Sequence, residues 1–295
     1  MLSFLKNIFQ SEPKQTKSTP EDVGAFYNET TDKFIEVYGE IIQAFRTHNV
    51  ADYLDYTIEQ ASLKDGLKVL DAGCGIGGPS SYFASKINSD FTGITISDEQ
   101  VKKAQELLKT KDLKGSVTIQ KGDYHKLDEL FPAESFDRIL FLESFGHSYN
   151  HTKVIEQAHK ALKPGGILYI KDLFKREHPN EEDGKRIDRI IDEINKAYRY
   201  NVADLYEVLK TIRRLNFIVL SVKTPDVKIG EFEHLTISND FQNLFDISKI
   251  IGWDDYVFPI DFYEIKVMKA PFDVNKEKHL YFLNNPSAAE HFKKK

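Results

Sequence analysis

Three glycines stand where an apolar run gives way to a helical pattern: Gly73, Gly75 and Gly78. The run before them, residues 68–71, has the pattern of a buried β-strand, and the residues after Pro79 have that of a helix. Glycines at a strand-to-helix turn let the backbone come close to a ligand because no Cβ stands in the way. Their spacing satisfies G-x-G-x-x-G, the dinucleotide fingerprint, but this short pattern alone is a weak signal.

The elements after this loop decide against a dinucleotide. A dinucleotide site needs a carboxylate about 20 residues after the glycine loop, at the end of the second strand, to hold the ribose hydroxyls. Here the second strand, residues 91–97, ends on hydroxyl side chains, and a helix follows from Asp98. Further strands are predicted at 117–119, 135–142 and 167–171, and their alternation with helices predicts a parallel sheet covered on both faces.

This series of elements resembles the class I S-adenosylmethionine (SAM) dependent methyltransferases over roughly residues 66–172. The resemblance implies an α/β, Rossmann-like fold with a seven-stranded, mostly parallel sheet in the order 3-2-1-4-5-7-6. Helices would cover both faces, and a helical lid would lie over the active site. The last two strands are predicted at 217–222 and 262–268, after helices at 187–198 and 205–215.

The resemblance also implies how the cofactor SAM is held. Asp71, at the end of the first strand, resembles the acid that contacts the ammonium of the SAM tail, and Gly73 and Gly75 would admit the tail and ribose. Asp123 resembles the carboxylate that accepts the adenine amino group, and Tyr124 would pack beside the ring. The plainer alternative for Asp71 is a helix cap or turn former.

The second strand departs from the commonest pattern of this family because no acid follows it. Residues 93–100, GITISDEQ, resemble the G-x-T-x-S-x-x-Q run of the cyclopropane fatty-acid synthases. There, hydroxyl and amide groups take over the ribose contacts, which makes Thr95, Ser97 and Gln100 the candidates here. Ser97 is also a good N-cap for the helix that begins at Asp98, with Gln100 in the capping-box position.

Two further segments indicate the substrate side. Residues 26–34, FYNETTDKF, resemble the Y-N-x-x-T-D-x-[YF] segment of sterol, tocopherol and terpene methyltransferases, which folds over SAM as a lid. Residues 143–147, ESFGH, resemble the E-x-F-G-H run of the cyclopropane synthases, at a position that faces the methyl group. The candidate catalytic residues are therefore Tyr27, Glu143 and His147.

These residue types suit methyl transfer to carbon. An attacking alkene becomes a carbocation, which needs aromatic faces and a carboxylate, and then a base for the departing proton. Glu143 and His147 would serve, with Tyr27 and either Trp253 or Tyr256 as the aromatic wall. An oxygen or nitrogen nucleophile asks only for proximity and one base. We expect an enzyme acting on a small, largely apolar acceptor, with C-methylation of an isoprenoid or other alkene ahead of O- or N-methylation.

Two other classes stay open. One is a SAM-binding module without catalysis, and the other is an NAD-dependent oxidoreductase, supported only by the glycine spacing. The histidines at 125, 151 and 159 lack metal-ligand spacing, so no metal is expected. The sequence does not decide whether a diphosphate is recognised, for which it offers Arg186, Arg189, Arg199, Arg213 and Arg214.

The composition of the chain limits the kinds of partner and the cellular location to be expected. A net charge of −6 and a pI near 5.9 argue against nucleic acid, because phosphate binding needs a basic surface. One cysteine excludes an internal disulfide and suits a reducing compartment, so a cytoplasmic location is expected. No apolar run approaches the ~20 residues that span a bilayer, so no stable membrane insertion is expected. A homo-oligomer stays open.

The predicted organisation has a catalytic core with additions around it. An N-terminal extension and linker (1–22) precedes a helical lid (23–62), the SAM-binding core (63–270) and a C-terminal tail (271–295). Helical insertions at about 174–201 and 223–258 would roof the substrate pocket, since ligands bind beyond the carboxyl ends of the strands. The lid carries an apolar stripe at helical spacing: Phe34, Val37, Ile41, Ile42 and Phe45.

Overall fold

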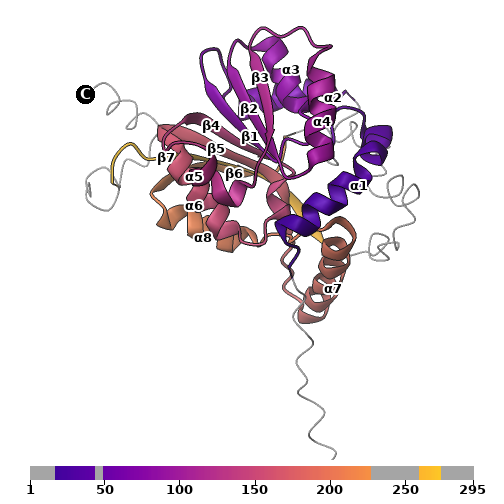
Figure 1. The fold of residues 1–295 in the computed structure, drawn as a ribbon. Coiled ribbons are helices and arrows are strands. Elements are labelled where there is room, and N and C mark those ends of the chain that lie inside the picture. The colour runs from indigo at the N-terminus through magenta and orange to yellow at the C-terminus, as the bar shows by residue number, and fades with distance from the viewer. Residues whose placement is uncertain (1–16, 44–48, 227–258, 274–295) are drawn as a thin grey trace, which may run out of the picture.

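A seven-stranded sheet forms the centre of the structure, a computed structural model that describes residues 17–43, 49–226 and 259–273 (Figure 1). Its order, β3-β2-β1-β4-β5-β7-β6, confirms the prediction. The first five strands are parallel, and β7 runs antiparallel to both of its neighbours. The strands are β1 (Lys68–Ala72), β2 (Asp90–Thr95), β3 (Ser116–Lys121), β4 (Phe136–Leu142), β5 (Leu162–Lys175), β6 (Phe217–Lys223) and β7 (Ile260–Lys269).

Helices cover both faces of the sheet (Figure 1). The apolar cores place α2 and α3 on one face of the sheet and α5, α6 and α8 on the other. α4 packs against β3. α7 packs against the C-terminal end of β5 and the N-terminal end of β7. The helices are α1 (Pro20–Tyr38), α2 (Val50–Gln60), α3 (Gly78–Lys86), α4 (Asp98–Leu108), α5 (Leu127–Leu130), α6 (His151–Ala161), α7 (Glu181–Tyr198) and α8 (Leu205–Arg214).

The central strands are apolar because both of their faces are covered. In β1, Val69, Leu70 and Ala72 are fully buried, and they pack into different cores on the two sides of the sheet. Such continuous apolar runs are typical of parallel strands between two helical layers. Polar groups are left for the carboxyl ends of these strands, where the chain turns into the following helices.

The lid region is two helices rather than the continuous pattern predicted from Val23 to about residue 61. α1 begins earlier, at Pro20, where Thr19 and Asp22 form a capping box, and it ends at Gly39. Gly39 has a φ of 66°, which an L side chain rarely adopts, and its N–H donates to the Ile35 carbonyl. Two members of the predicted stripe therefore follow the helix: Ile41 and Ile42.

α1 lies across the carboxyl ends of the strands and is anchored at several points. Near its start, the Ser18 N–H donates to Asn201 Oδ1 (3.1 Å), and the Asn201 amide donates back to the Ser18 carbonyl. Further along, Asp32 forms an ion pair of 2.8 Å with Lys103 on α4. Figure 1 shows this helix beside α4 and leading towards α7. We refer to α1 as the lid helix.

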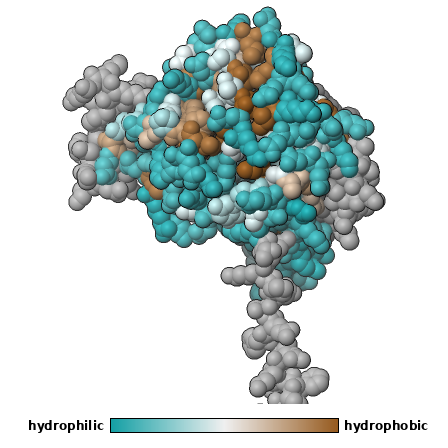
Figure 2. Space-filling model, in the orientation of Figure 1, coloured by the Kyte–Doolittle hydropathy of each residue, from teal (hydrophilic) through white to brown (hydrophobic). Residues whose placement is uncertain are grey.

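The other predicted additions are only partly described. The predicted insertion 174–201 contains α7, and the helices expected at 187–198 and 205–215 correspond to α7 and α8. Residues 227–258 lie outside the described residues, and so do Phe45, Trp253 and Tyr256. The described surface is mostly hydrophilic on the side drawn in Figure 2, and Tyr206, 65% exposed, is the one large hydrophobic side chain among the described residues that is mostly exposed.

Candidate active site

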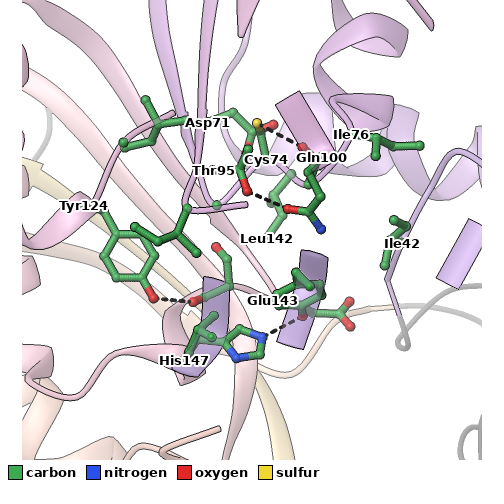
Figure 3. Close-up of a pocket in the computed structure, with 18 of the residues that line it drawn as sticks. Ile42, Asp71, Cys74, Ile76, Thr95, Gln100, Tyr124, Leu142, Glu143 and His147 are labelled. Carbon is green, nitrogen blue, oxygen red and sulfur yellow. Dashed lines mark hydrogen bonds between the residues drawn. The ribbon is translucent and has the colours of Figure 1, made fainter. Parts of the chain in front are cut away.

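A pocket opens at the carboxyl ends of β1 to β4, under the lid helix and residues 39–43, which we name the roof segment (Figure 3). Its lining brings together residues that are far apart in sequence. Of the residues predicted to bind cofactor or to act in catalysis, it contains Tyr27, Asp71, Gly73, Gly75, Thr95, Gln100, Asp123, Tyr124, Glu143 and His147. Ser97 is the predicted site residue outside this lining.

A side chain is excluded at Gly73 and at Gly75 for different reasons. A Cβ on Gly73 would lie 2.4 Å from Ser144 Cβ, so this position is filled by the chain that follows β4. A Cβ on Gly75 would have only Gln100 Nε2, 4.0 Å away, within reach. Both residues have positive φ, 83° and 57°. Gly75 is therefore the position where bare backbone faces open space, whereas Gly73 permits close packing within the protein.

Asp71 presents a buried carboxylate at the end of β1. It is 1% exposed, and the Ser80 hydroxyl donates a 2.6 Å hydrogen bond to Oδ2. Burial raises the pKa of Asp71 to about 6, against the lowering effect of the Ser80 bond. Ionising this buried carboxyl costs free energy in the empty protein, and a cation bound beside it would stabilise the ionised form. The site therefore favours a cationic ligand.

Thr95, Ser97 and Gln100 form one hydrogen-bonded unit between β2 and α4. The Thr95 hydroxyl donates to Gln100 Oε1, which leaves the amide nitrogen of Gln100 near Gly75. Ser97 caps α4 by accepting the Gln100 N–H (3.1 Å), and its hydroxyl donates to Asn28 Oδ1 on the lid helix (2.7 Å). The expected N-cap is confirmed, and Ser97 lies between the helix and the lid instead of at the pocket wall.

Asp123 and Tyr124 follow β3 in a turn that is fixed by side-chain contacts. Asp123 Oδ1 accepts from the backbone N–H of His125 (2.8 Å) and contacts its Nδ1 (2.6 Å). Burial opposes ionisation of Asp123, but the bonds from His125 outweigh it and lower the pKa of the carboxyl. The Tyr124 hydroxyl donates to the Ser144 carbonyl, which fixes its ring at the pocket.

His147 and Tyr27 form a hydrogen-bonded dyad between the core and the lid helix. His147 Nδ1 lies 3.1 Å from the Arg199 carbonyl, which can only accept, so Nδ1 carries the ring hydrogen. Nε2 therefore accepts from the Tyr27 hydroxyl, 2.8 Å away. Burial lowers the pKa of His147 to about 4 and raises that of Tyr27. At neutral pH the imidazole is unprotonated and the phenol keeps its proton.

Glu143 has a partner that the sequence analysis missed. Lys171, fully buried on β5, places its Nζ 2.9 Å from Glu143 Oε1 and donates to Gln43 Oε1 at 2.7 Å. The available signal was a lysine at the end of the otherwise apolar strand predicted at 167–171, beside the strand that ends at Glu143. A lysine in a buried strand needs a partner, and the nearest acid in the sheet was already a site candidate.

Asp172 is the second functional group that sequence reasoning missed. Its oxygens accept the N–H groups of Gly146 (3.0 Å) and Leu173 (2.8 Å), which holds the short turn that carries His147. Burial raises the pKa of Asp172 to about 7, although these backbone bonds lower it in part. Tyr200 packs against the other side of that turn, with its ring 4.0 Å from the His147 ring.

Two further searches of the described residues bear on partners. No group of three or more histidine, cysteine or acidic side chains there is placed to hold a metal ion. Within the same residues, no helix combines the length and the apolar character needed to cross a bilayer.

Residues 63–205 match a family model described as "Methyltransferase domain". This segment is a class I, SAM-dependent methyltransferase domain. It contains the pocket residues that follow the first four strands, and the match decides against the oxidoreductase interpretation of the glycine spacing. The cofactor of the domain is SAM.

Curated relatives are similar over part of their length. A sterol 24-C-methyltransferase of Aspergillus fumigatus is 26% identical over 215 residues, covering 69% of this chain and 55% of the relative. The 27-O-demethylrifamycin SV methyltransferase of Amycolatopsis mediterranei is 31% identical over 186 residues, covering 58% of this chain and 66% of the relative. The chain thus spans little more than half of the fungal protein.

Solved structures share the fold over nearly their whole length. The [4+2]-cyclase SpnF superposes with a TM-score of 0.68 at 19% identity, covering 86% of this chain and 97% of that one. The geranyl diphosphate C-methyltransferase of Streptomyces coelicolor gives a TM-score of 0.67 at 13% identity, covering 88% and 100%. At these identities the likeness establishes the fold alone.

The residues present fit SAM. Gly75 leaves open space where any other residue would place a Cβ, and the buried Asp71 carboxylate suits the ammonium of the SAM tail. Asp123 still has its second oxygen for a donor, since both bonds from His125 go to Oδ1. The pocket therefore supplies an anion, an acceptor and exposed backbone, which are the surfaces that an amino-acid tail, a nucleobase and a ribose need.

Proposed function

We propose that the protein transfers a methyl group from SAM to a small, largely apolar acceptor held under the lid helix, by C-methylation of an isoprenoid or other alkene. The names of a curated relative and a structural neighbour, a sterol 24-C-methyltransferase and a geranyl diphosphate C-methyltransferase, support this reaction class. When bound, SAM supplies an electrophilic methyl group on a sulfonium centre.

Residues at the strand ends would hold the cofactor. Asp71 would pair with the ammonium of the tail, and Gly75 would let the tail pass against backbone. Thr95 and Gln100 would offer hydroxyl and amide groups to the ribose, and Asp123 would accept from the adenine amino group. The arrangement of these groups in one pocket supports the assignment. We propose an indirect part for Ser97, which holds Asn28 of the lid helix.

The low proton affinity of His147 carries the proposal of carbon methylation. A base whose pKa is about 4 does not deprotonate a neutral alcohol or hydrocarbon beforehand, because the transfer is uphill by many pKa units. It readily accepts a proton from a carbocation, which is a strong acid. The acceptor proton would pass to the Tyr27 oxygen as the Tyr27 hydrogen moves to His147 Nε2, along the existing 2.8 Å bond.

The charges of the pocket support an uncharged acceptor. The described lining contains four carboxylates, from Glu40, Asp71, Asp123 and Glu143, and it contains no lysine or arginine. An anionic group such as a diphosphate would meet these acids without a cationic side chain from the described residues. None of the five arginines considered for a diphosphate belongs to this lining.

O- or N-methylation is the second candidate, and the Glu143–Lys171 pair favours it. A carboxylate whose charge is balanced by an ammonium 2.9 Å away stabilises a developing carbocation less than an unpaired one would. An oxygen or nitrogen nucleophile makes no such demand. An oxonium ion is a strong acid that would lose its proton to the same dyad, and an ammonium product would not need the dyad, because it can lose its proton to solvent after release.

The first test is calorimetric titration with S-adenosylhomocysteine (SAH), with NADH as the control. We expect saturable binding of SAH alone. The second test incubates the protein with trideuteromethyl-SAM and matched acceptors: neutral isoprenoid alkenes, their saturated analogues, and the corresponding alcohols and amines. C-methylation predicts deuterated product from the alkenes and none from the saturated hydrocarbons, with the label on carbon by NMR.

The outcomes separate the candidates. Label on oxygen or nitrogen would replace the first proposal with the second. Binding of SAH without product from any acceptor would instead support a binding module without catalysis. We also propose a cytoplasmic location, which the single and free Cys74 supports, and the oligomeric state stays a prediction.

A further inference from the structure

Asp123 receives two hydrogen bonds from one residue, and both of them end on the same oxygen. Oδ1 lies 2.8 Å from the backbone nitrogen of His125 and 2.6 Å from its ring nitrogen Nδ1. The backbone bond alone would complete the cap of the short 3₁₀ helix that follows, Tyr124–Lys126. The ring bond adds nothing to this cap, so its presence needs another explanation.

The imidazole of His125 is itself held from its other side. A carboxylate oxygen can only accept, so Nδ1 carries a ring hydrogen, and Nε2 lies 2.9 Å from Ser148 Oγ. The same Oγ accepts the Asn150 N–H at 3.0 Å, which leaves the hydroxyl hydrogen of Ser148 for Nε2. The ring also stacks on Tyr149, with the ring centres 4.2 Å apart. The imidazole therefore cannot turn away from Asp123 without losing these contacts.

Serine, histidine and aspartate bonded in this order are the groups of a hydrolase triad, but the burial of the serine excludes that role. Ser148 is fully buried and does not line the pocket, so its hydroxyl is out of reach of a bound substrate. The accessible member of the series is the acid. The Asp123 side chain is 17% exposed, compared with 3% for that of His125, and both residues line the pocket. The bonds therefore serve the carboxylate, which is the group that a ligand can touch.

We infer that His125 is a positioning residue, which turns the Asp123 carboxylate so that its second oxygen faces the base of the bound cofactor. Two bonds on Oδ1 restrict rotation of the carboxylate and leave Oδ2 for a donor on the ligand. Burial alone would raise the pKa of Asp123, but the bonds from the His125 ring and backbone outweigh it and lower the pKa. Oδ2 is thus offered as an ionised acceptor. The inference rests on the proposed function, in which the adenine of SAM lies beside Asp123.

The adenine amino group is the donor that Oδ2 would bind, so the test compares SAH with an analogue in which hydrogen replaces this amino group. Both ligands have the same tail and ribose, and a general loosening of the protein would weaken both of them alike. The ratio of their two dissociation constants therefore isolates the contact with the base. We would measure this ratio by calorimetry at neutral pH for the native protein, His125→Phe, His125→Asn and Asp123→Ala.

In the native protein, we expect SAH to bind at least about tenfold more tightly than the analogue, because the analogue lacks a hydrogen bond to a charged group. His125→Phe keeps an aromatic ring beside Tyr149 but has no ring donor, so the ratio should fall below about threefold. His125→Asn places an amide donor near the position of Nδ1 and should keep the ratio above about fivefold. A ratio in His125→Phe as high as in the native protein would overturn the inference.

The Asp123→Ala variant separates failure of the inference from failure of the proposed site. A high native ratio that falls to about one in Asp123→Ala would establish the contact with the base, and His125→Phe would then decide the role of the histidine. A native ratio near one, or a high ratio in Asp123→Ala, would refute the contact at Asp123 and the inference with it. Failure of the native protein to bind SAH would refute the cofactor site as a whole.

If His125→Phe does not fold, His125→Gln supplies the deciding measurement. Its amide reaches the position of Nε2 and can bond to Ser148, while Asp123 keeps only the backbone bond, so the ratio should again fall below about threefold. A high ratio in His125→Gln would contradict the inference. The matched control is His159→Phe, on α6 and outside the pocket lining, because His159 Nε2 has no hydrogen-bond partner among the described residues. This control should leave the ratio unchanged.

Discussion

At the scale of single residues, Asp71 shows how a binding group can destabilise the protein that carries it. Its pKa is about 6 in the folded protein, compared with the ordinary value of 3.8. A carboxyl with a raised pKa binds its proton more tightly in the folded state, so ionising it at neutral pH costs stability on the order of 3 kcal/mol. In the proposed site, the ammonium of the cofactor offsets this cost when it pairs with the carboxylate.

Asp71→Asn should therefore stabilise the empty protein and weaken the cofactor site. We expect a higher melting temperature at pH 7.5 and a loss of about 2–5 kcal/mol in SAH binding, which is at least thirtyfold in affinity. Differential scanning fluorimetry and calorimetry would measure the two effects. Asp90→Asn, exposed at the opposite end of the sheet, should change neither. A variant that binds SAH normally would remove Asp71 from the site.

The same carboxyl predicts how cofactor binding depends on pH. Only the ionised form attracts the ammonium of the ligand, so the affinity for SAH should fall as the pH drops below about 6, by up to tenfold per unit. The Asp71→Asn variant should show a much flatter profile over the same range. Equal slopes in the two proteins would assign the dependence to another group.

Tyr27 and His147 should behave as one catalytic unit. Tyr27→Phe and His147→Gln are each expected to lower turnover by about 10²–10⁴, since either change breaks the proton path. The double variant should be little worse than the single ones, because residues that act together are not additive. SAH affinity should fall by no more than about tenfold, which is the loss expected from one anchor of the lid helix, and additive losses of turnover would contradict a shared role.

Sequence could name most of the pocket because most of the candidates lie at the end of a strand or shortly after it. In a parallel sheet the carboxyl ends meet at one edge, so residues such as Asp71, Asp123 and Glu143 had to converge. Lys171 could not be found in this way, because its side chain lies behind the wall and its role depends on Gln43 from another part of the chain. Ser97 resembled a ligand contact but lies against the lid helix.

At the scale of elements, the lid helix is held against the core by polar bonds of its side chains. Asn28 Oδ1 accepts from the Ser97 hydroxyl and from the Glu99 N–H at the start of α4. Ser97 is the N-cap of α4, and Glu99 lies in its first turn, where unpaired N–H groups need an acceptor. Asn28 thus supplies an acceptor to the start of α4, and the same bonds fix the position of the lid helix.

Asn28→Ala should loosen the lid without unfolding the core. We expect SAH to dissociate about five- to tenfold faster, in line with the loss of about 1 kcal/mol in hydrogen bonding. The melting temperature of the empty protein should move by no more than about 2 °C. Glu29→Ala, on the neighbouring exposed position, is the control for helix propensity and should leave the dissociation rate alone. Equal rates in both variants would contradict the role of Asn28.

Elements were predictable where local patterns are strong and less so where the chain changes direction. The strand before the glycine loop and the cap at Ser97 are confirmed because burial and capping leave local signals. The break at Gly39 was overlooked, since the apolar spacing of Ile41 and Ile42 continued the helical pattern past it. That break is what frees the roof segment to reach Lys171.

At the scale of the whole molecule, two buried acids should make the empty protein less stable as the pH rises. The folded pKa values of Asp71 and Asp172 are about 6 and about 7, whereas in the unfolded chain both lose their protons near pH 4. Between these values the folded state binds more protons, so these groups lower its stability with rising pH.

The direction of this pH dependence can be checked by thermal melts of the empty protein between pH 5 and 8. Burial lowers the pKa values of three histidines, which act in the opposite direction in every variant: His147, His151 and His159. The comparison of slopes therefore carries the prediction. With rising pH, we expect the melting temperature to change less favourably in the native protein than in Asp172→Asn, and most favourably in a variant that also carries Asp71→Asn. The slope is the relevant quantity, because Asp172→Asn also disturbs the bonds to Gly146 and Leu173. A steeper fall in the variants would contradict the assignment.

Local sequence patterns cannot predict the order and direction of all the strands in the sheet. Periodicity predicts the number and order of the strands, but nothing local in residues 260–269 indicates that β7 inserts antiparallel between β5 and β6. That placement depends on pairing with β5, nearly 100 residues away, and with β6, about half as far, and it was available only through resemblance to a known family. The same holds for α1, whose contacts are all distant.

Those distant contacts have a consequence for how the protein is made. The anchors of the lid helix, at Ser97, His147 and Asn201, lie 69, 120 and 183 residues beyond their partners in and just before α1. All three anchors are translated after α1, and the last of them, Asn201, follows only when about two thirds of the 295 residues have been made. The earliest of the described helices is thus fully anchored only after Asn201 has been added, so its docking is a late step of folding.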